Sequence, residues 1–210
     1  MAKAESRNDS IILEKLSAAY PAAASELNFQ NEYQLLVAVM LSAQCTDKKV
    51  NDVTPELFAT FPDFESLSKA QVSKLENIIR PINYYKTKAR HLLLTAQTIA
   101  AEMFGVVPRT MTLLRTLPGV GQKTANVILN ELGVEATIPV DTHVFRVSRR
   151  LGFSSATKVS GVEEDLKMRF DSKHWRELHH LLILHGRRVC KARSPNCAGC
   201  VVAAVCPKRF

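Results

Sequence analysis

The order of hydrophobic and polar positions along the chain predicts a protein built from helices. Residues 33–44, YQLLVAVMLSAQ, are apolar nearly all round, which at this length predicts a buried helix rather than an amphipathic surface helix. Residues 71–79 and 88–105 carry apolar residues three and four apart, so both are predicted to be amphipathic helices. Gly105 is the expected C-cap of the second.

The C-terminal half continues the helical pattern. Ser160 and Glu163 have the spacing of a capping box ahead of another helical stretch, and residues 174–186 are predicted to form a helix that ends at Gly186. Strand-like alternation is scarce, and only residues 137–140, TIPV, are weakly β-like. Without an internal repeat, a low-complexity tract or a long linker, any domains must be tightly joined. The predicted fold class is all-α.

Composition adds few constraints. With 210 residues, of which 46% are hydrophobic, the chain is long enough for one or two cores and has the composition of a soluble globular protein. The longest apolar runs, such as residues 35–41, are far shorter than the roughly 18 residues that a membrane span needs. The polar N-terminal segment, MAKAESRNDS, lacks the apolar core of a secretory signal, so we expect a cytoplasmic protein without membrane association.

The net charge of +8 lies entirely in the second half. Residues 1–105 carry 11 Lys and Arg against 12 Asp and Glu, whereas residues 106–210 carry 17 against 8. This asymmetry suggests a polyanion-binding face, although a solvated basic surface would give the same count. The expected contributors are Arg149, Arg150, Arg187, Arg188, Lys191, Arg193, Lys208 and Arg209.

Four of the five cysteines lie close together near the C-terminus, as Cys190-x6-Cys197-x2-Cys200-x5-Cys206. Disulfides are improbable in a cytoplasmic chain, so the cluster predicts a metal centre. Four thiolates suit either a structural zinc ion or an iron–sulfur cluster, and the spacing leaves both open. Cys45 stands apart, next to an apolar run, and is interpreted as a small buried hydrophobic residue.

Residues 117–130, LPGVGQKTANVILN, predict a tight hairpin between a helix that ends near Arg115 and one that begins near Gln122. Glycines allow positive φ and close approach of the backbone, and N–H groups beside a helix N-terminus can bind a phosphate. Alone, this pattern could equally be a plain helix–helix turn. Lys123 lies in the first turn of the second helix, where the helix dipole disfavours a positive charge.

The combination of these features resembles the endonuclease III family of DNA glycosylases. It comprises the hairpin with its lysine, residues 140–147 (VDTHVFRV) and the cysteine spacing 6, 2 and 5, and it extends over residues 41–47, 84–89 and 179–190. The resemblance implies two lobes: a six-helix domain with a helix-hairpin-helix motif at residues 25–135, and an iron–sulfur domain at residues 1–24 and 136–210. It also implies a [4Fe–4S] cluster on Cys190, Cys197, Cys200 and Cys206.

The same resemblance implies two catalytic residues on opposite walls of a cleft between the lobes. Lys123 would be the nucleophile that attacks C1′ of the damaged nucleotide, expels the base and forms a Schiff base with the opened sugar. A desolvating pocket at a helix N-terminus would favour the unprotonated amine that this attack requires. Asp141 would stabilise positive charge on the sugar and assist proton transfer, and it could also cap the helix that follows it.

Family residues expected to contact DNA include Gln44, which would fill the space left by a flipped nucleotide. A second wedge is expected near Ile82, where the chain has Asn83 and Tyr84 instead of the family's usual Gly and frequent Leu. Asn tolerates a left-handed backbone, so we expect that turn to survive. The bulkier Tyr84 can stack differently, which leaves the opposite-base preference and the lesion range open. Gln122 replaces a common Arg, which should weaken phosphate contact slightly. The remaining expected DNA contacts are Leu117, Gly119, Gly121, His143 and Lys191.

The function implied is excision of oxidised or ring-saturated pyrimidines from duplex DNA, followed by β-elimination at the abasic site, by a monomer acting on the nucleoid. Adenine- and thymine-mismatch glycosylases share the hairpin and the cysteines but lack a lysine at position 123. A non-catalytic DNA-binding module is disfavoured by Lys123 and Asp141 together. A pyrimidine-dimer glycosylase would use the same residues and stays open.

Overall fold

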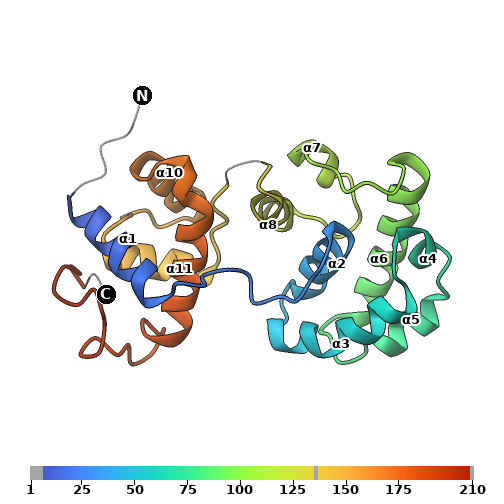
Figure 1. The fold of residues 1–210 in the computed structure, drawn as a ribbon, viewed down its shortest axis with the longest axis horizontal. Helices are drawn as coiled ribbons and strands as arrows, with labels where there is room; N and C mark the ends of the chain where they lie inside the picture. The colour runs from blue at the N-terminus through green and yellow to red at the C-terminus, as the bar shows by residue number, and fades with distance from the viewer. Residues whose placement is uncertain (1–6, 135–136, 209–210) are drawn as a thin grey trace. The chain divides into compact units, whose positions relative to one another are not determined.

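The computed structural model describes residues 7–134 and 137–208, and within these ranges the chain forms helices and no strand (Figure 1). The prediction of an all-α fold is therefore confirmed. No helix in the described ranges has both the length and the apolar character needed to cross a membrane. In chain order the helices are α1 (Arg7–Ala19), α2 (Glu32–Ser42), α3 (Asp47–Thr60), α4 (Phe64–Ser68), α5 (Val72–Ile78), α6 (Tyr85–Glu102), α7 (Met111–Leu114), α8 (Gln122–Leu132), α9 (Thr142–Leu151), α10 (Val159–Arg169), the 3₁₀ helix η1 (Ser172–His174) and α11 (Trp175–Arg188).

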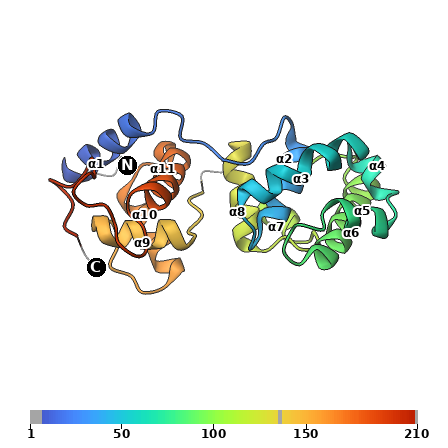
Figure 2. The ribbon, with the colours of Figure 1, turned by 90° about the horizontal axis from the view of Figure 1, so that it is seen from below.

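The chain forms two compact units, which Figures 1 and 2 show from two sides. Residues 25–135, with α2 to α8, are called the hairpin unit below; residues 1–24 and 136–210, with α1 and α9 to α11, are called the cysteine unit. Each unit has its own cluster of buried apolar side chains. Each unit therefore positions its own functional residues on a core of its own.

Helix α2 is the centre of the hairpin unit. Its side chains from Tyr33 to Leu41, apart from Gln34, are buried, and it packs on α3, α6 and α8. Asn31 caps its start by accepting a hydrogen bond from the Gln34 N–H at 2.9 Å. The predicted buried helix is confirmed, but it ends at Ser42, because the backbone leaves the helical region at Ala43 (φ −56°, ψ 115°) and turns at the left-handed Gln44 (φ +54°).

Helices α5 and α6 confirm the two predicted amphipathic helices, with one correction at the end of α6. The C-cap is Met103, not Gly105. Phe104 and Gly105 both have positive φ, and the Gly105 N–H donates to the Ile99 carbonyl at 3.0 Å. The glycine thus belongs to the turn beyond the cap, where its N–H satisfies a carbonyl of the last helical turn.

Two predictions in the cysteine unit are wrong for local reasons. Helix α10 begins after Lys158, which makes no side-chain cap bond, so Ser160 lies inside the helix and forms no capping box. The weakly β-like residues 137–140 are buried and are not part of a strand. The Pro139 carbonyl accepts a hydrogen bond from His179 Nδ1 on α11 at 2.9 Å.

Gly186 does not end α11, which continues to Arg188. A Cβ at Gly186 would lie 3.1 Å from the side chains of Arg146, His143 and Val147. The glycine therefore lets α11 lie close against α9, and packing rather than helix termination explains it.

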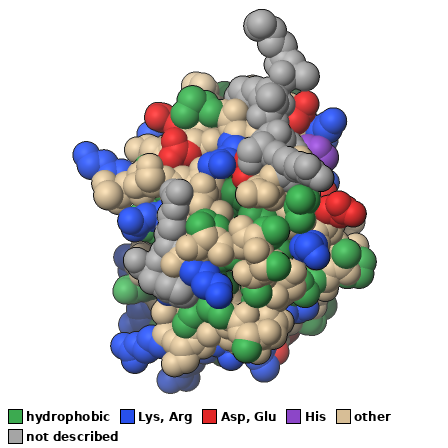
Figure 3. Space-filling model, turned by 90° about the vertical axis from the view of Figure 1, so that its left-hand side faces the viewer, with side chains coloured by type: hydrophobic (Ala, Val, Ile, Leu, Met, Phe, Trp, Pro, Cys, Tyr) green, Lys and Arg blue, Asp and Glu red, His purple; other side chains and the backbone are tan. Residues whose placement is uncertain are grey.

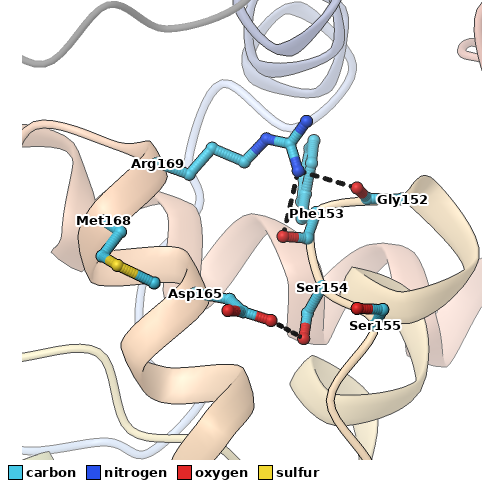
Figure 4. A pocket seen from close by; sticks show the side chains of 7 residues that line it. All are labelled: Gly152, Phe153, Ser154, Ser155, Asp165, Met168 and Arg169. Carbon is cyan, nitrogen blue, oxygen red and sulfur yellow. Dashed lines mark hydrogen bonds between the residues drawn. The ribbon is translucent and has the colours of Figure 1, made fainter.

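A pocket of about 420 Å³ opens on the cysteine unit between α10 and the turn after α9 (Figure 4). Arg169 crosses it, donating from Nη1 to the carbonyls of Gly152 at 2.8 Å and Phe153 at 3.1 Å and from Nε to Asp9 Oδ2 at 2.5 Å. Ser154 donates to Asp165 Oδ2 at 2.5 Å on the opposite wall. These bonds join α1, α9 and α10, which gives the lining residues a structural role.

Candidate functional site

The predicted hairpin lies between α7 and α8. Gly119 has φ of +79°, and a Cβ there would lie 2.6 Å from His91 Nδ1 on α6, so both the backbone and the space require glycine. Gly121 differs, because its φ is −85° and a Cβ would meet nothing within 4 Å. Leu117 is buried, its N–H donates to the Leu114 carbonyl at 3.2 Å and its carbonyl accepts from the Val120 N–H at 3.1 Å, so it shapes the turn.

Gly121 is the N-cap of α8 and provides no side-chain oxygen for the first-turn N–H groups. Gln122 and Lys123 are both exposed in this first turn. The hairpin unit therefore presents uncapped N–H donors and a lysine side chain together, an arrangement suited to a phosphate group or another anion.

Asp141 caps the start of α9. Its Oδ1 accepts hydrogen bonds from the N–H groups of His143 and Val144, both at 2.8 Å, so the expected capping role is confirmed. Its Oδ2 lies 3.5 Å from His143 Nδ1. The carboxylate is thus held rigidly by two backbone donors, with its second oxygen directed toward the half-buried imidazole.

The two loops expected to enter DNA both belong to the hairpin unit. Gln44, Asn83 and Tyr84 are exposed, Tyr84 at 67%. The left-handed residue of the second loop is Tyr84 (φ +59°), not Asn83 as predicted. Asn83 instead uses its side chain, donating from Nδ2 to the Gln44 carbonyl at 2.7 Å. Sequence reasoning missed this link because the two residues are 39 positions apart.

The four C-terminal cysteines line one pocket, together with Arg150 and His185. Arg150 Nη1 donates to Cys190 Sγ at 3.6 Å, and the Lys208 N–H donates to Cys206 Sγ at 3.4 Å. Burial raises the pKa values of the Cys200 and Cys206 thiols, so their thiolates need a compensating positive charge. A metal centre would supply that charge.

The geometry of these cysteines bears on which metal centre fits. The cysteines line a shared pocket, with N–H donors directed at two of the sulfurs. An all-cysteine donor set of this kind can hold a structural zinc ion or an iron–sulfur cluster. Among the residues that the structure describes, no group of three or more His, Cys, Asp or Glu is already arranged around a metal ion.

His185 is a residue near this pocket that sequence reasoning missed. It is buried, its Nε2 lies 3.6 Å from Cys200 Sγ, and its Nδ1 lies 3.1 Å from the Tyr20 hydroxyl. Burial lowers the pKa of His185 to about 4, so the ring is neutral near pH 7 and one nitrogen donates while the other accepts. Only the tertiary structure brings Tyr20, from the end of the N-terminal segment, to this ring.

The expected basic face is partly built into the fold. Arg150 donates to the carbonyls of Lys191 at 2.7 Å and Ala192 at 3.1 Å, and so anchors the cysteine loop. Lys and Arg side chains gather on the lower part of the face shown in Figure 3. Arg209 lies outside the described residues. The exposed members of the predicted set are Arg149, Arg187, Arg188, Lys191, Arg193 and Lys208.

The helical hairpin with its exposed lysine and the pocket lined by four cysteines agree with the family that a comparison of the sequence identifies. Residues 37–171 match the model of the HhH-GPD superfamily base excision DNA repair proteins. The chain belongs to the HhH-GPD superfamily. An endonuclease III from Synechocystis sp. is 43% identical over 198 residues, which cover 94% of this chain and 89% of the relative.

Further relatives extend the HhH-GPD assignment to the whole chain. Endonuclease III of Escherichia coli is 39% identical over 195 residues, covering 93% of this chain and 92% of that protein. A solved structure of a trapped covalent intermediate between an endonuclease III and DNA, an estranged-adenine complex, matches with a TM-score of 0.87 and 39% identity, covering 96% of each chain. The protein is thus a DNA glycosylase and AP lyase of base excision repair, of the endonuclease III type.

Proposed function

We propose that this enzyme releases oxidised or ring-saturated pyrimidines from duplex DNA and then nicks the strand 3′ to the abasic site by β-elimination. The observation that carries the proposal is the exposed Lys123 in the uncapped first turn of α8, directly after the hairpin. An endonuclease III has been trapped in a covalent intermediate with DNA, which is the chemistry that a nucleophilic amine provides.

Lys123 is the proposed nucleophile. Its amine attacks C1′, the glycosidic bond breaks with its electron pair leaving on the base, and ring opening gives a Schiff base. The following β-elimination removes a proton from C2′ and expels the 3′ phosphate. Because Lys123 is exposed in the free protein, bound DNA would exclude water from its amine during the reaction.

Asp141 is the proposed partner in proton transfer and charge stabilisation. With Oδ1 occupied by two N–H donors, Oδ2 is the oxygen proposed to act toward the sugar. His143, 3.5 Å from Oδ2, is proposed to orient that oxygen and to lie near the DNA backbone. A rigid cap suits this task, because the carboxylate requires little rearrangement during the reaction.

The proposed DNA interface uses both units. In the hairpin unit the backbone of Gly119 and Gly121, with the side chain of Gln122, would hold phosphate in a turn shaped by Leu117. The loop of Gln44 and the loop of Asn83 and Tyr84 would enter the gap left by the flipped nucleotide. In the cysteine unit, Lys191 would contribute to a basic loop. The proposed partner is double-stranded DNA with damaged pyrimidines or abasic sites, bound by a monomer in the cytoplasm on the nucleoid.

Cys190, Cys197, Cys200 and Cys206 are proposed to hold a [4Fe–4S] cluster. The cluster would supply the positive charge that stabilises the buried thiolates and would fix the loop that carries Lys191. Purified protein with four irons and broad visible absorbance would support this assignment. Colourless protein with stoichiometric zinc would contradict it.

Borohydride trapping tests the catalytic proposal. Duplexes with thymine glycol, an abasic site or no lesion are incubated with wild type, Lys123→Gln and Lys74→Gln. Lys74 is the matched control, since it is an exposed lysine in the first turn of α5. We expect adducts on both damaged duplexes with wild type and Lys74→Gln, and none with Lys123→Gln.

The other outcomes separate the parts of the proposal. Trapping on the abasic duplex alone would confirm the lyase reaction and contradict the proposed release of oxidised pyrimidines. An adduct that persists in Lys123→Gln would show that another amine is the nucleophile. No adduct with wild type would remove the catalytic assignment.

A further inference from the structure

The two exposed loops of the hairpin unit are joined by a side chain that a glycine at the same position would not supply. Gln44 follows α2 and Tyr84 precedes α6, and both have a left-handed backbone, with φ of +54° and +59°. Asn83 Nδ2 donates to the Gln44 carbonyl at 2.7 Å. This hydrogen bond connects the backbone of one loop to the side chain of the other.

The same segment satisfies the carbonyl groups at the end of α2. Lys88, in the first turn of α6, is buried and donates from Nζ to the carbonyls of Leu41 at 2.7 Å and Ala43 at 2.6 Å. The Cys45 N–H donates to the Ser42 carbonyl at 3.0 Å. With Asn83 bound to Gln44, each of the carbonyls from position 41 to 44 has a donor.

The donors differ in what they fix. Lys88 holds the last helical turn of α2, which is also fixed by the buried side chains of that helix. Asn83 holds the carbonyl of the left-handed residue itself, whose side chain is exposed and has no such support. Non-glycine residues keep a left-handed backbone where their surroundings determine it. For Gln44 the turn itself does so, because the bond from the Cys45 N–H to the Ser42 carbonyl closes it with Ala43 at φ −56° and ψ 115°. The Asn83 amide is the contact that ties this turn to the second loop.

We infer that Asn83 is a positioning residue that makes the Gln44 and Tyr84 loops one preformed wedge for the gap left by a flipped nucleotide. The inference rests on the proposed function, since it assigns the wedge to duplex DNA. Fixing both loops before binding reduces the conformational entropy lost when their side chains enter the stack. Asn83 therefore acts through Gln44 rather than on the damaged nucleotide.

A double-mutant cycle tests this coupling. The kcat/KM for base release from a thymine glycol duplex is measured for wild type, Asn83→Ala, Gln44→Ala and the double variant. One hydrogen bond of ordinary strength corresponds to about a fivefold loss for Asn83→Ala in the wild-type background. Because Asn83 acts through Gln44, the same substitution should cost less than about twofold once the Gln44 side chain is absent.

A spectroscopic readout reports insertion directly. With 2-aminopurine opposite an abasic analogue, we expect Asn83→Ala to reduce the fluorescence change on binding, and Asn83→Gln, which keeps the amide, to restore part of it. Asn83→Asp keeps the size of the side chain but has no hydrogen-bond donor. At high salt, which screens its negative charge from DNA, it should behave as Asn83→Ala does. Asn77→Ala, at an exposed asparagine on α5, is the control and should match wild type.

The outcomes distinguish this inference from the proposed function. If wild type neither releases the base nor forms a trapped adduct, the proposed function fails. If wild type is active and Asn83→Ala costs the same factor with and without the Gln44 side chain, the bridge is only a loop contact and the inference is overturned. Thermal unfolding of each variant identifies any that fail to fold. If Asn83→Ala fails, Asn83→Asp, which also lacks the donor, replaces it in the cycle.

Discussion

Replacing Gly119 by alanine should destabilise the hairpin unit far more than the same change two residues later. At Gly119 the new Cβ would lie 2.6 Å from His91 Nδ1 and 3.0 Å from His91 Cβ, on a backbone with φ of +79°. The left-handed backbone costs an alanine about 1–2 kcal/mol and the overlap about 1–3 kcal/mol, so the free energy of unfolding should fall by about 2–5 kcal/mol. At about 2–4 °C per kcal/mol, the thermal unfolding midpoint should fall by about 4–20 °C.

Gly121→Ala provides the matched control, because its φ is −85° and its Cβ meets nothing within 4 Å. Alanine is a weaker N-cap than glycine, which lowers stability, but it also makes the unfolded chain less flexible, which raises stability. The free energy of unfolding should therefore change by less than about 1 kcal/mol. Urea unfolding followed by circular dichroism measures both variants. Adding His91→Ala to Gly119→Ala should recover about 1 kcal/mol of the overlap cost. Equal unfolding midpoints for the two glycine variants would refute the reasoning.

Three further predictions concern stability. Asp9→Asn weakens the ion pair between the buried Asp9 and the half-buried Arg169 and should lower the free energy of unfolding by about 1–3 kcal/mol in urea; a change below about 0.5 kcal/mol would mean that the pair is dispensable. Burial raises the pKa of Tyr33, whose hydroxyl donates to the Phe61 carbonyl, so above pH 10 the unfolded state loses a proton that the folded state keeps. Above pH 10 the free energy of unfolding of the wild type should therefore fall more steeply than that of Tyr33→Phe, by as much as about 1.4 kcal/mol per pH unit. Parallel curves of unfolding free energy against pH for the two proteins would contradict this. Gly186→Ala should lower the unfolding free energy by about 1 kcal/mol, because crowding of Arg146, His143 and Val147 outweighs the gain in helix propensity; a more stable variant would show that α9 and α11 can separate.

Much of the fold could be predicted from the sequence because its signals are local. The apolar run at residues 33–44 has no polar face, so burial was its only stable arrangement, and α2 is buried. The hairpin between Arg115 and Gln122 followed from proline and glycine placed between two helical patterns. Element ends were less predictable: Gly186 was interpreted as a helix end, although its role is to admit α9, a neighbour 40 residues away in the chain.

The candidate site divides in the same way. The sequence alone determined which residue types are present for chemistry: Lys123 in a helical first turn, Asp141 as a cap, and four clustered cysteines, since spacing along a chain defines such local patterns. Only the tertiary structure decided which side chains meet across the fold. It placed the left-handed turn at Tyr84, gave Asn83 the Gln44 carbonyl and brought Tyr20 to His185. Such contacts depend on how helices distant in sequence pack, and hydrophobic periodicity specifies which face is buried but not which polar groups it brings together.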